Sequence, residues 1–420
     1  MRHPVLAIGV LILAGEVIFA LPFHIPRFFR ASLLEVFALS NADLGDVFAV
    51  YGVTAMIAYF PGGAIADRYP PHKLMSLSLF ATALGGIYLA TIPGYRGLSV
   101  LFAYWGVTSI LLFWAALIRG TREWGGDRAQ GRAFGILDGG RGLAAAALAS
   151  IAVLVFAGAH VADPTTVDPA TRRAAFIEVI TFYTVVTFVV SALAYWFVPR
   201  PSQRAIARAS PLANISEVMA NPLVWAQALI VVCAYCGYKG LDNYSLYAVD
   251  VLGMSEVDSA AFTANCAYLR PLGAVAAGFI ADRCSASRVM LALFVLLGLS
   301  FGPLSVAVPE PGASGVIVAN ILLSFAGVYA LRGVYFALLE ETHVPQHVTG
   351  TAVGLVSLVG YTPDVFFAAI GGRLIDGSPG VTGHQHYFAF VTLIMLAGAA
   401  MTGLLMLLTR RRQRLAADSG

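Results

Sequence analysis

Charged residues are scarce in this chain of 420 residues: Asp, Glu, Lys and Arg together make up 12% of it, against about 25% in an average soluble domain. Hydrophobic residues make up 59%, and so little charge would not cover them in water. This shortage excludes a soluble enzyme, a disordered protein and a protein that binds nucleic acid. The class that remains is a polytopic membrane protein with the lipid bilayer as its surroundings.

Lysine is rarer still, since only Lys73 and Lys239 occur among 26 basic residues. With abundant Ala and Gly, this preference for Arg indicates a GC-rich bacterial genome and hence a bacterial cytoplasmic (inner) membrane location. Of the four cysteines, Cys233 and Cys236 have redox or metal spacing but lie in an apolar run, so we interpret them as buried small residues. The chain contains no GxxxxGK or HExxH motif, and we expect no enzyme activity, cofactor or metal site.

Long apolar runs are plentiful, and a membrane-spanning helix needs about 20 mostly apolar residues. The sequence therefore predicts an all-α membrane protein with twelve spans. They lie at 4–26, 43–66, 74–93, 97–118, 133–158, 174–198, 222–247, 257–281, 289–308, 313–338, 348–372 and 386–409.

The longest connection, 199–221, predicts a cytoplasmic linker between an N-terminal six-helix half (1–198) and a C-terminal six-helix half (222–409). A basic cytoplasmic tail (410–420) follows. With the N-terminus inside, sixteen of the 26 Lys and Arg residues fall on the cytoplasmic side and six on the outer side. This asymmetry predicts that both termini are cytoplasmic.

Short motifs recur at offsets of 215, 219 and 221 residues. The pairs are Gly63-Ala-Ile-Ala-Asp67-Arg68 with Gly278-Phe-Ile-Ala-Asp282-Arg283, Ala133-Phe-Gly135 with Ala352-Val-Gly354, and Ala116-Leu-Ile118 with Ala337-Leu-Leu339. Nearly constant offsets indicate that the second half repeats the first. Two six-helix repeats are typical of a solute path between halves that rock to give alternating access.

The run Gly63-x-x-x-Asp67-Arg68 with Lys73 resembles the signature loop between helices 2 and 3 of the major facilitator superfamily, and 278–288 resembles its degenerate repeat. The resemblance extends over the whole chain. It implies a twelve-helix major facilitator fold, which we expect to be a monomer. The loop glycine that usually follows the Asp by three residues is replaced by Pro70 and, in the second copy, by Ser285.

The resemblance also implies that these loops brace one conformation of the transporter. The residues predicted to act in gating are Asp67, Arg68, Lys73, Asp282, Arg283 and Arg288. Asp67 is expected to face the start of helix 11 near Val348, and Asp282 the start of helix 5 near Ala133, because a helix N-terminus stabilises a carboxylate. The alternative is a charged turn that only sets topology.

Ionisable residues also lie inside the predicted spans, where each costs roughly 2.5–3.5 kcal/mol and is commonly functional. They are Glu16, His24, Asp138, Arg141, Lys239, Asp242, Arg270, Arg332 and Asp364. The resemblance implies that helices 3, 6, 9 and 12 lie outside the central cavity, and these four contain no deep charge. The segregation indicates a central polar path.

Deep cations outnumber deep anions along this path, which favours an anionic small-molecule substrate, because an unpaired buried cation is costly until an anion arrives. Predicted substrate-binding residues are Lys239, Arg270, Arg141, His24, Arg332, Tyr235 and Tyr238. Predicted proton-coupling residues are Glu16, Asp138 and Asp364, since burial favours the uncharged form of a carboxyl group.

Static alternatives exist for the same charges. Asp138 and Arg141 are spaced i,i+3 and would pair on one helix face. Arg270 would instead bind a distant carboxylate from Glu16 or Asp364. Arg332 would act in a gate with Glu340 or Glu341.

Other stretches resemble the organophosphate:phosphate antiporter branch of the superfamily. They are Asp43-Leu-Gly45 through Ile57-Ala-Tyr59 to Asp67-Arg68, Gly350-Thr-Ala-Val-Gly354 with Gly360-Tyr361, and Tyr238-x-Gly-Leu-Asp242. The branch binds phosphate through one arginine in helix 1 and one in helix 7. Here His24 and Gly237 occupy those positions, with Lys239 two residues later, so a carboxylate such as a sugar acid is as plausible as a phosphate.

Three functions follow as hypotheses. The first is a secondary transporter of a small organic anion (a sugar acid, carboxylate or organophosphate), driven by protons or by exchange with a counter-anion. The second is a proton-coupled exporter of drugs or metabolites, which would have a more apolar site. The third is a transporter-like solute sensor.

Overall fold

The computed structural model describes residues 4–126, 130–158, 168–200, 215–308, 314–341 and 349–418. Every regular element within these ranges is a helix. Nine helices of the described residues are long and apolar enough to cross a membrane, and ten if one bent pair counts as a single span. The predicted all-α, multi-span architecture is therefore confirmed.

The two predicted spans that are not among these candidates, 74–93 and 257–281, are also helical but differ in detail from the prediction. The range 74–93 corresponds to α5 (Pro71–Leu89), whose first turn carries the polar residues His72 and Lys73. The range 257–281 was expected to be one helix, but it breaks at Tyr268 into α13 (Glu256–Ala267) and α14 (Leu269–Cys284). Neither piece alone is long enough to span a bilayer.

Two compact units make up the molecule. Unit 1 contains residues 1–206, 242–271 and 364–376, and unit 2 contains 207–241, 272–363 and 377–420. Unit 1 thus joins the predicted N-terminal half to two segments from the C-terminal half. The predicted linker 199–221 falls partly outside the described residues, which resume with α10 (Ile215–Ala220).

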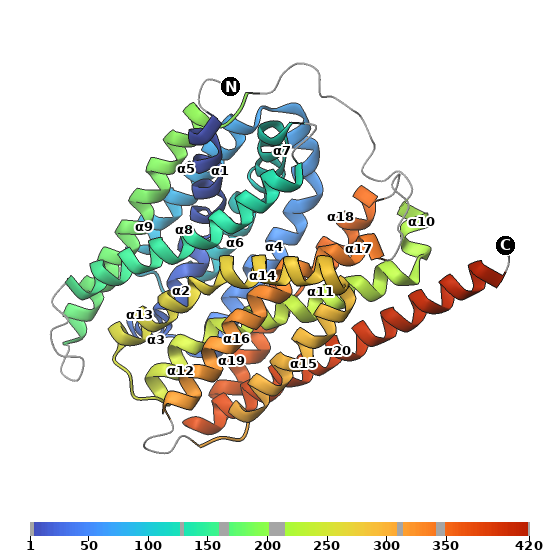
Figure 1. Cartoon of the computed structure of the whole chain (residues 1–420). Helices are drawn as coiled ribbons and strands as arrows, with labels where there is room; N and C mark the ends of the chain where they lie inside the picture. Colours follow the sequence, from blue (N-terminus) through green and yellow to red (C-terminus); the bar gives the residue numbers. More distant parts are fainter. Residues whose placement is uncertain are drawn as a thin grey trace. The chain divides into compact units, whose positions relative to one another are not determined.

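In unit 1, α1, α5, α8 and α9 run side by side, and α4 packs along α6 (Figure 1). The elements from the N-terminal half are α1 (Pro4–Val17), the π-helix η1 (Ala20–His24), α2 (Ile25–Phe28), α3 (Arg30–Val36), α4 (Asn41–Arg68), α5, α6 (Tyr95–Leu111), α7 (Trp114–Gly125), α8 (Gln130–Gly158) and α9 (Pro169–Phe197). The segments from the C-terminal half carry α12 (Tyr244–Asp250), α13 and α19 (Pro363–Asp376). Of these, α13 packs on α8 and α2, and α12 on α3.

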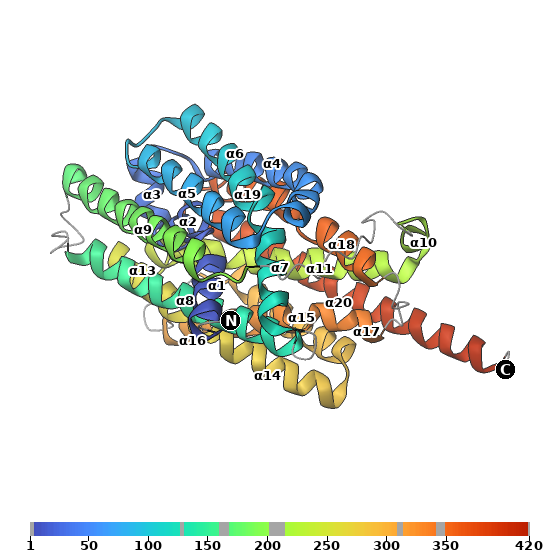
Figure 2. The same cartoon turned by 90° about the horizontal axis from the view of Figure 1, so that it is seen from above.

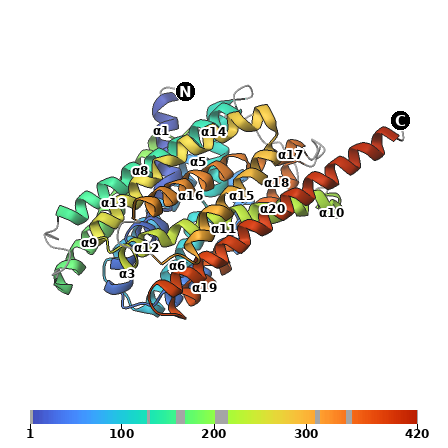
Figure 3. The same ribbon diagram turned by 60° about the horizontal axis from the view of Figure 1, so that its bottom comes forward.

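In unit 2, α20 packs along both α11 and α15 (Figure 3). Its elements are α10, α11 (Pro222–Gly240), most of α14, α15 (Ala286–Leu304), α16 (Ser314–Val334), the 3₁₀ turn η3 (Tyr335–Ala337), α17 (Leu338–Glu341), α18 (Thr349–Gly360) and α20 (Val381–Asp418). The last helix continues through most of the predicted basic tail.

Three helices of the C-terminal half are broken close to the points where the chain passes from one unit to the other. The break between α11 and α12 is a 3₁₀ turn, η2 (Leu241–Asn243), and α13 and α14 meet at Tyr268, four residues before Leu272. Between α18 and α19 the break precedes Pro363, a residue type that cannot donate the backbone hydrogen bond a continuous helix needs.

The predicted gating loops differ in backbone conformation. In the first copy Pro70 is extended, with φ −70° and ψ 139°. In the second copy Ser285 has φ 140°, a region that favours glycine, and its Oγ accepts a hydrogen bond from the backbone N–H of Arg288. The glycine typical of the superfamily fits this second conformation, and Ser285 adopts it at a cost in backbone strain.

Glycines on α4 allow a close approach to α19 within unit 1 (Figure 2). A Cβ on Gly45 would lie less than 3.0 Å from backbone atoms of Ala368, and one on Gly52 would meet the backbone of Asp364 equally closely. Small residues at such a crossing let two helix backbones come within van der Waals contact. The contact joins a helix of the N-terminal half to a segment of the C-terminal half.

We predict that Gly45→Ala lowers the free energy of unfolding by about 1–3 kcal/mol, because the added methyl group overpacks the crossing with α19. The measurement is unfolding of the purified protein in detergent. Gly63→Ala on the same helix is the matched control, since nothing lies within 4 Å of a Cβ there. A helical Gly→Ala change without a clash stabilises by roughly 0.5–1 kcal/mol, so equal losses for both variants would contradict the prediction.

Candidate functional site

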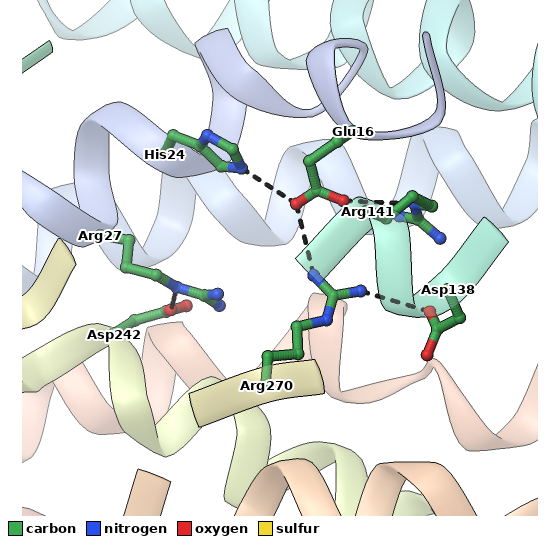
Figure 4. Close-up of polar contacts among 7 residues, drawn as sticks. All are labelled: Glu16, His24, Arg27, Asp138, Arg141, Asp242 and Arg270. Carbon is green, nitrogen blue, oxygen red and sulfur yellow. Dashed lines mark hydrogen bonds and ion pairs between the residues drawn. The ribbon is translucent and has the colours of Figure 1, made fainter. Parts of the chain in front are cut away.

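A buried carboxylate, Glu16 near the end of α1, is the centre of a charged cluster in unit 1 (Figure 4). Its Oε1 lies 3.2 Å from His24 Nε2 and 3.4 Å from Arg270 Nη1. Its Oε2 lies 3.2 Å from Arg141 Nε, an ion pair without hydrogen-bond geometry. Glu16 is only 4% exposed, and two guanidinium groups beside it compensate for the burial of its charge.

The bend in the first span accounts for the contact between Glu16 and His24. In a straight α-helix two residues eight apart lie about 12 Å apart along the axis. Here α1 ends at Val17, and η1 and α2 continue at an angle of 44° to it. Pro22 explains the break, since its ring excludes the carbonyl of Ile18 from the helical ladder. π-helical turns of this kind are frequent at functional sites.

Arg270 connects the two halves of the chain within unit 1. It lies in the first turn of α14 and is 6% exposed. Besides Glu16, it contacts Asp138 on α8, with 3.3 Å between Nη2 and Oδ1. The structure therefore has the arrangement of the static alternative, in which Arg270 binds the distant carboxylate of Glu16.

The expected local pair of Asp138 with Arg141 is wrong in detail. Asp138 contacts Arg270, and Arg141 contacts Glu16. The guanidinium of Arg141 also lies 5.7 Å from the ring centroid of Trp114, a cation–π distance. Arg141 therefore turns toward α1 and α7, where a buried carboxylate and an aromatic face both stabilise its charge.

Tyr183 was not identified from the sequence. Its ring on α9 meets the His24 ring edge-on, with centroids 5.9 Å apart. Its hydroxyl and the Nδ1 of His24 are buried, and neither has a hydrogen-bond partner among the described residues. No motif marks a lone tyrosine in an apolar span, so only the fold could place it beside Glu16.

A second set of polar contacts in unit 1 also joins the two halves. Arg27 on α2 pairs with Asp242 at 2.5 Å between Nε and Oδ1. Arg172 on α9 pairs with Glu256 of α13 and with Glu35, and Ser32 donates to Glu256. The sequence places these arginines only among the outer charges, because their partners are more than 80 residues away.

The same set continues between α4 and α19. Arg373 binds both carboxylate oxygens of Asp46, at 2.8 and 3.0 Å. Asp376 accepts hydrogen bonds from the Asn41 side chain and from the backbone N–H of Ala42, at the start of α4. A carboxylate at this position is favoured by the helix dipole.

Unit 2 contains an aromatic cluster around Arg332 of α16. The guanidinium lies 3.9 Å from the centroid of the Tyr238 ring and 6.0 Å from that of Tyr235, both on α11. Tyr235 meets Tyr361 edge-on, and the hydroxyls of Tyr361 and Tyr335 are 3.3 Å apart. An arginine stacked on a ring retains its N–H edge for a carboxylate or phosphate.

The alternative in which Arg332 pairs with Glu341 receives no support. Glu341 instead accepts hydrogen bonds from the backbone N–H groups of Ala286 and Ser287, at the start of α15. This helix N-terminus satisfies the carboxylate. The side chain of Glu340 lies outside the described residues.

The other predicted residues are spread over both units. Lys239 is buried in α11 of unit 2, and Asp364 is half-buried in the first turn of α19 in unit 1. The gating residues are exposed: Asp67 and Arg68 end α4, Lys73 begins α5, and Asp282, Arg283 and Arg288 flank Ser285. Val348, the expected neighbour of Asp67, lies outside the described residues.

Comparison with known proteins identifies relatives along nearly the whole chain. The Major Facilitator Superfamily model matches residues 6–368. The chain is 26% identical over 425 residues to the inner membrane protein YihN of Escherichia coli (strain K12), with 98% of each chain covered. It is 26% identical over 357 residues to the probable nitrate/nitrite antiporter NarK1 of Thermus thermophilus, which covers 77% of this chain and 75% of that protein.

Solved structures show the same fold. The crystal structure of a D-xylose-proton symporter superposes with a TM-score of 0.73, at 14% sequence identity, over 95% of this chain and 96% of that one.

We predict that Arg27 and Asp242 are energetically coupled by about 1–3 kcal/mol, because the pair is largely buried, with side chains 10% and 14% exposed. A double-mutant cycle with Arg27→Ala and Asp242→Ala measures this coupling from the free energy of unfolding in detergent. The pair of Arg373 with Asp46 is the control, since its side chains are 57% and 36% exposed and screening by water should make its coupling clearly smaller. Equal coupling in both cycles would contradict the role of burial.

Proposed function

Because this chain belongs to the major facilitator superfamily and is a multi-pass inner membrane transporter, we propose that it moves a small organic anion together with a proton. The observation that supports this proposal is the contact of one buried carboxylate, Glu16, with two arginines, Arg141 and Arg270. Membership of the organophosphate:phosphate antiporter branch, which the sequence resemblance suggests, would instead predict anion exchange. Carboxylates are the substrates to be tested first.

Glu16 acts in this proposal as an internal substitute for the substrate anion. Arginine recognises carboxylate and phosphate groups through parallel N–H bonds. In the structure the carboxylate beside Arg141 and Arg270 is Glu16, which contacts each arginine through one oxygen atom. While Glu16 is ionised, a second anion at the same arginines would face a like charge in a poorly screened environment.

Protonation of Glu16 removes this competition. The neutral carboxyl group no longer balances two guanidinium charges, and the contact of Arg270 with Asp138 remains. The excess of positive charge in a buried site then favours an incoming anion. Proton and anion consequently bind together, which is the requirement for symport.

The proton has a plausible entry route along the same cluster. The Asp138 side chain is 53% exposed, while Glu16 is buried behind Arg270. His24 bonds Glu16 from the other side, and the two ring nitrogens of an imidazole can donate or accept a proton. Asp138 and His24 thus provide groups on two sides of Glu16 that exchange protons with it.

Protonation of Glu16 also affects the connection between the N-terminal and C-terminal halves within unit 1. Arg270 comes from the C-terminal half and Glu16 and Asp138 from the N-terminal half, all within unit 1. Loss of the Glu16 charge weakens this bridge, leaving the contacts of Arg27, Arg172 and Arg373 to hold the halves in unit 1. With both termini cytoplasmic, as the charge asymmetry predicts, these contacts lie at the outer face of the membrane. Breaking them would open the protein to the outside.

The names of the related proteins give only indirect information about the substrate. The name of NarK1 indicates an inorganic anion, and that of the solved symporter indicates a neutral sugar with a proton. The cluster of Arg332 with four tyrosines in unit 2 suits a hydroxylated anion, because tyrosine hydroxyls bond sugar oxygens while the guanidinium bonds an acid group. Sugar acids combine both features.

The first experiment is a thermal-shift screen of purified protein against gluconate, glucuronate, glycerol 3-phosphate, inorganic phosphate, nitrate, glucose and tetraphenylphosphonium. A ligand of the folded state raises the apparent stability by mass action. We expect stabilisation by one class of organic acid. Stabilisation by tetraphenylphosphonium and by none of the anions would overturn the proposal in favour of an exporter.

We predict that the stabilising acid binds more tightly as the pH falls, by up to about tenfold per pH unit, the limit for uptake of one proton. In Glu16→Gln the affinity should be high and independent of pH, because the amide imitates the neutral carboxyl group. Accumulation driven by a pH gradient in proteoliposomes should disappear, whereas counterflow exchange should persist. Glu178→Gln, an exposed carboxylate on α9, is the control and should behave as the unmodified protein.

The outcome that rejects Glu16 as the proton site is a pH dependence that survives in Glu16→Gln. His24→Asn then decides between sites, because loss of the pH dependence in that variant would assign the proton to the imidazole. Binding that is independent of pH in the unmodified protein would favour anion exchange.

A further prediction concerns the aromatic cluster of unit 2. We expect Tyr238→Ala to weaken anion binding by roughly 3- to 30-fold, because Arg332 loses the ring that positions its guanidinium and a cation–π contact of about 0.5–2 kcal/mol. Tyr238→Phe retains the ring and should bind within about threefold of the unmodified protein. Equal losses in the two variants would show that the hydroxyl, and not the ring, is what matters.

A further inference from the structure

A pocket of about 110 Å³ lies in unit 2, apart from the charged cluster of Glu16 and from the aromatic cluster of Arg332. It is lined by residues from the start of α15, among them Ser285 and Arg288, and by residues near the end of α20, among them Thr409 and Arg410. The two helices pack along each other up to this point (Figure 3).

The pocket provides the groups that bind a phosphate. Among the residues that line it, Arg288 and Arg410 carry guanidinium groups, and Ser285, Ser287 and Thr409 carry hydroxyl groups. Both arginines are exposed, and within the described residues the structure gives neither an ion pair. Arginine forks and hydroxyl donors are the usual partners of phosphate oxygens.

Glu341 is the one acidic residue of the lining, and its carboxylate already has hydrogen-bond donors. Its carboxylate accepts hydrogen bonds from the backbone N–H groups of Ala286 and Ser287. The N-terminus of α15 therefore serves Glu341, and an added anion depends on the two arginines.

The position of the pocket along α20 indicates a membrane ligand. Leu405 and Met406 line it beside Arg410. The apolar part of α20 ends here, since Leu407, Leu408 and Thr409 are followed by three consecutive arginines. This sequence places the pocket at the level where acyl chains meet headgroups.

We propose that this pocket binds the phosphate of an anionic phospholipid, with Arg288 and Arg410 on the phosphate and Leu405 and Met406 against the first methylene groups of the acyl chains. A free phosphate ester would use the arginines but not the apolar wall. Basic pockets between membrane-spanning helices on the cytoplasmic side commonly bind such headgroups. The proposal is independent of the transported substrate.

The test is native mass spectrometry of the detergent-purified full chain titrated with phosphatidylglycerol or with phosphatidylcholine. We expect one phosphatidylglycerol to bind more tightly than phosphatidylcholine. In the double variant Arg288→Ala, Arg410→Ala this affinity should fall by roughly 30-fold, since each basic residue near an anionic lipid contributes about a factor of five. Arg410→Ala alone should lower the affinity for phosphatidylglycerol about fivefold, and this single variant is the test if the double variant does not fold.

Arg411→Ala is the matched control, because Arg411 is exposed on the same helix end but does not line the pocket. A loss in Arg411→Ala equal to that in Arg410→Ala would replace the pocket by a diffuse attraction to the basic tail. Equal binding of both lipids would also overturn the proposal. Displacement of phosphatidylglycerol by inorganic phosphate or glycerol 3-phosphate would assign the site to a free phosphate instead.

Discussion

The pairing of Glu16 with two arginines inside unit 1 is the interaction on which the rest of the proposed mechanism depends. An ionised arginine within a bilayer is costly, and it is retained when it has a partner or a function. Here the partner is a carboxylate that a single proton neutralises. A site that is balanced in one protonation state and unbalanced in the other converts a proton into a preference for an anion. No conformational signal over a distance is required, because both events occur on the same few atoms.

The contact of Glu16 with Arg270 also joins the charged cluster to a break between two helices of unit 1. Arg270 stands at the start of α14, directly before Pro271 and close to the break at Tyr268. Breaks also occur at η2 and before Pro363, where the chain changes units. A helix broken at such a point can rotate on one side of the break without losing hydrogen bonds on the other. Segments 242–271 and 364–376 are thus suited to separate from the N-terminal half as bodies of fixed structure.

Much of the fold was accessible from the sequence, because hydropathy and repeat offsets depend on many residues together. Each of the twelve predicted ranges contains helix in the described residues. The same criterion found the buried Glu16, Lys239 and Arg270 but missed the buried Arg27 and Arg30. Their partners were harder to predict. The contacts between Arg270 and Glu16, and between Arg27 and Asp242, span more than 200 residues, and no local spacing encodes them. The local pair of Asp138 with Arg141 that spacing suggested is replaced by contacts across the fold, of Asp138 with Arg270 and of Arg141 with Glu16.

The repeated loops show how two copies of one motif come to differ in physical behaviour. Pro70 fixes an ordinary backbone conformation in the first copy, whereas Ser285 holds a strained φ of 140° in the second. The strained residue lines the pocket proposed to bind a lipid phosphate, next to Arg288. A lipid bound there shifts the balance between conformations only by the difference in its affinity for them. If relief of the strain at Ser285 moves Arg288, the affinity differs between states, and membrane composition then acts on transport through the second loop while the first remains insensitive to it.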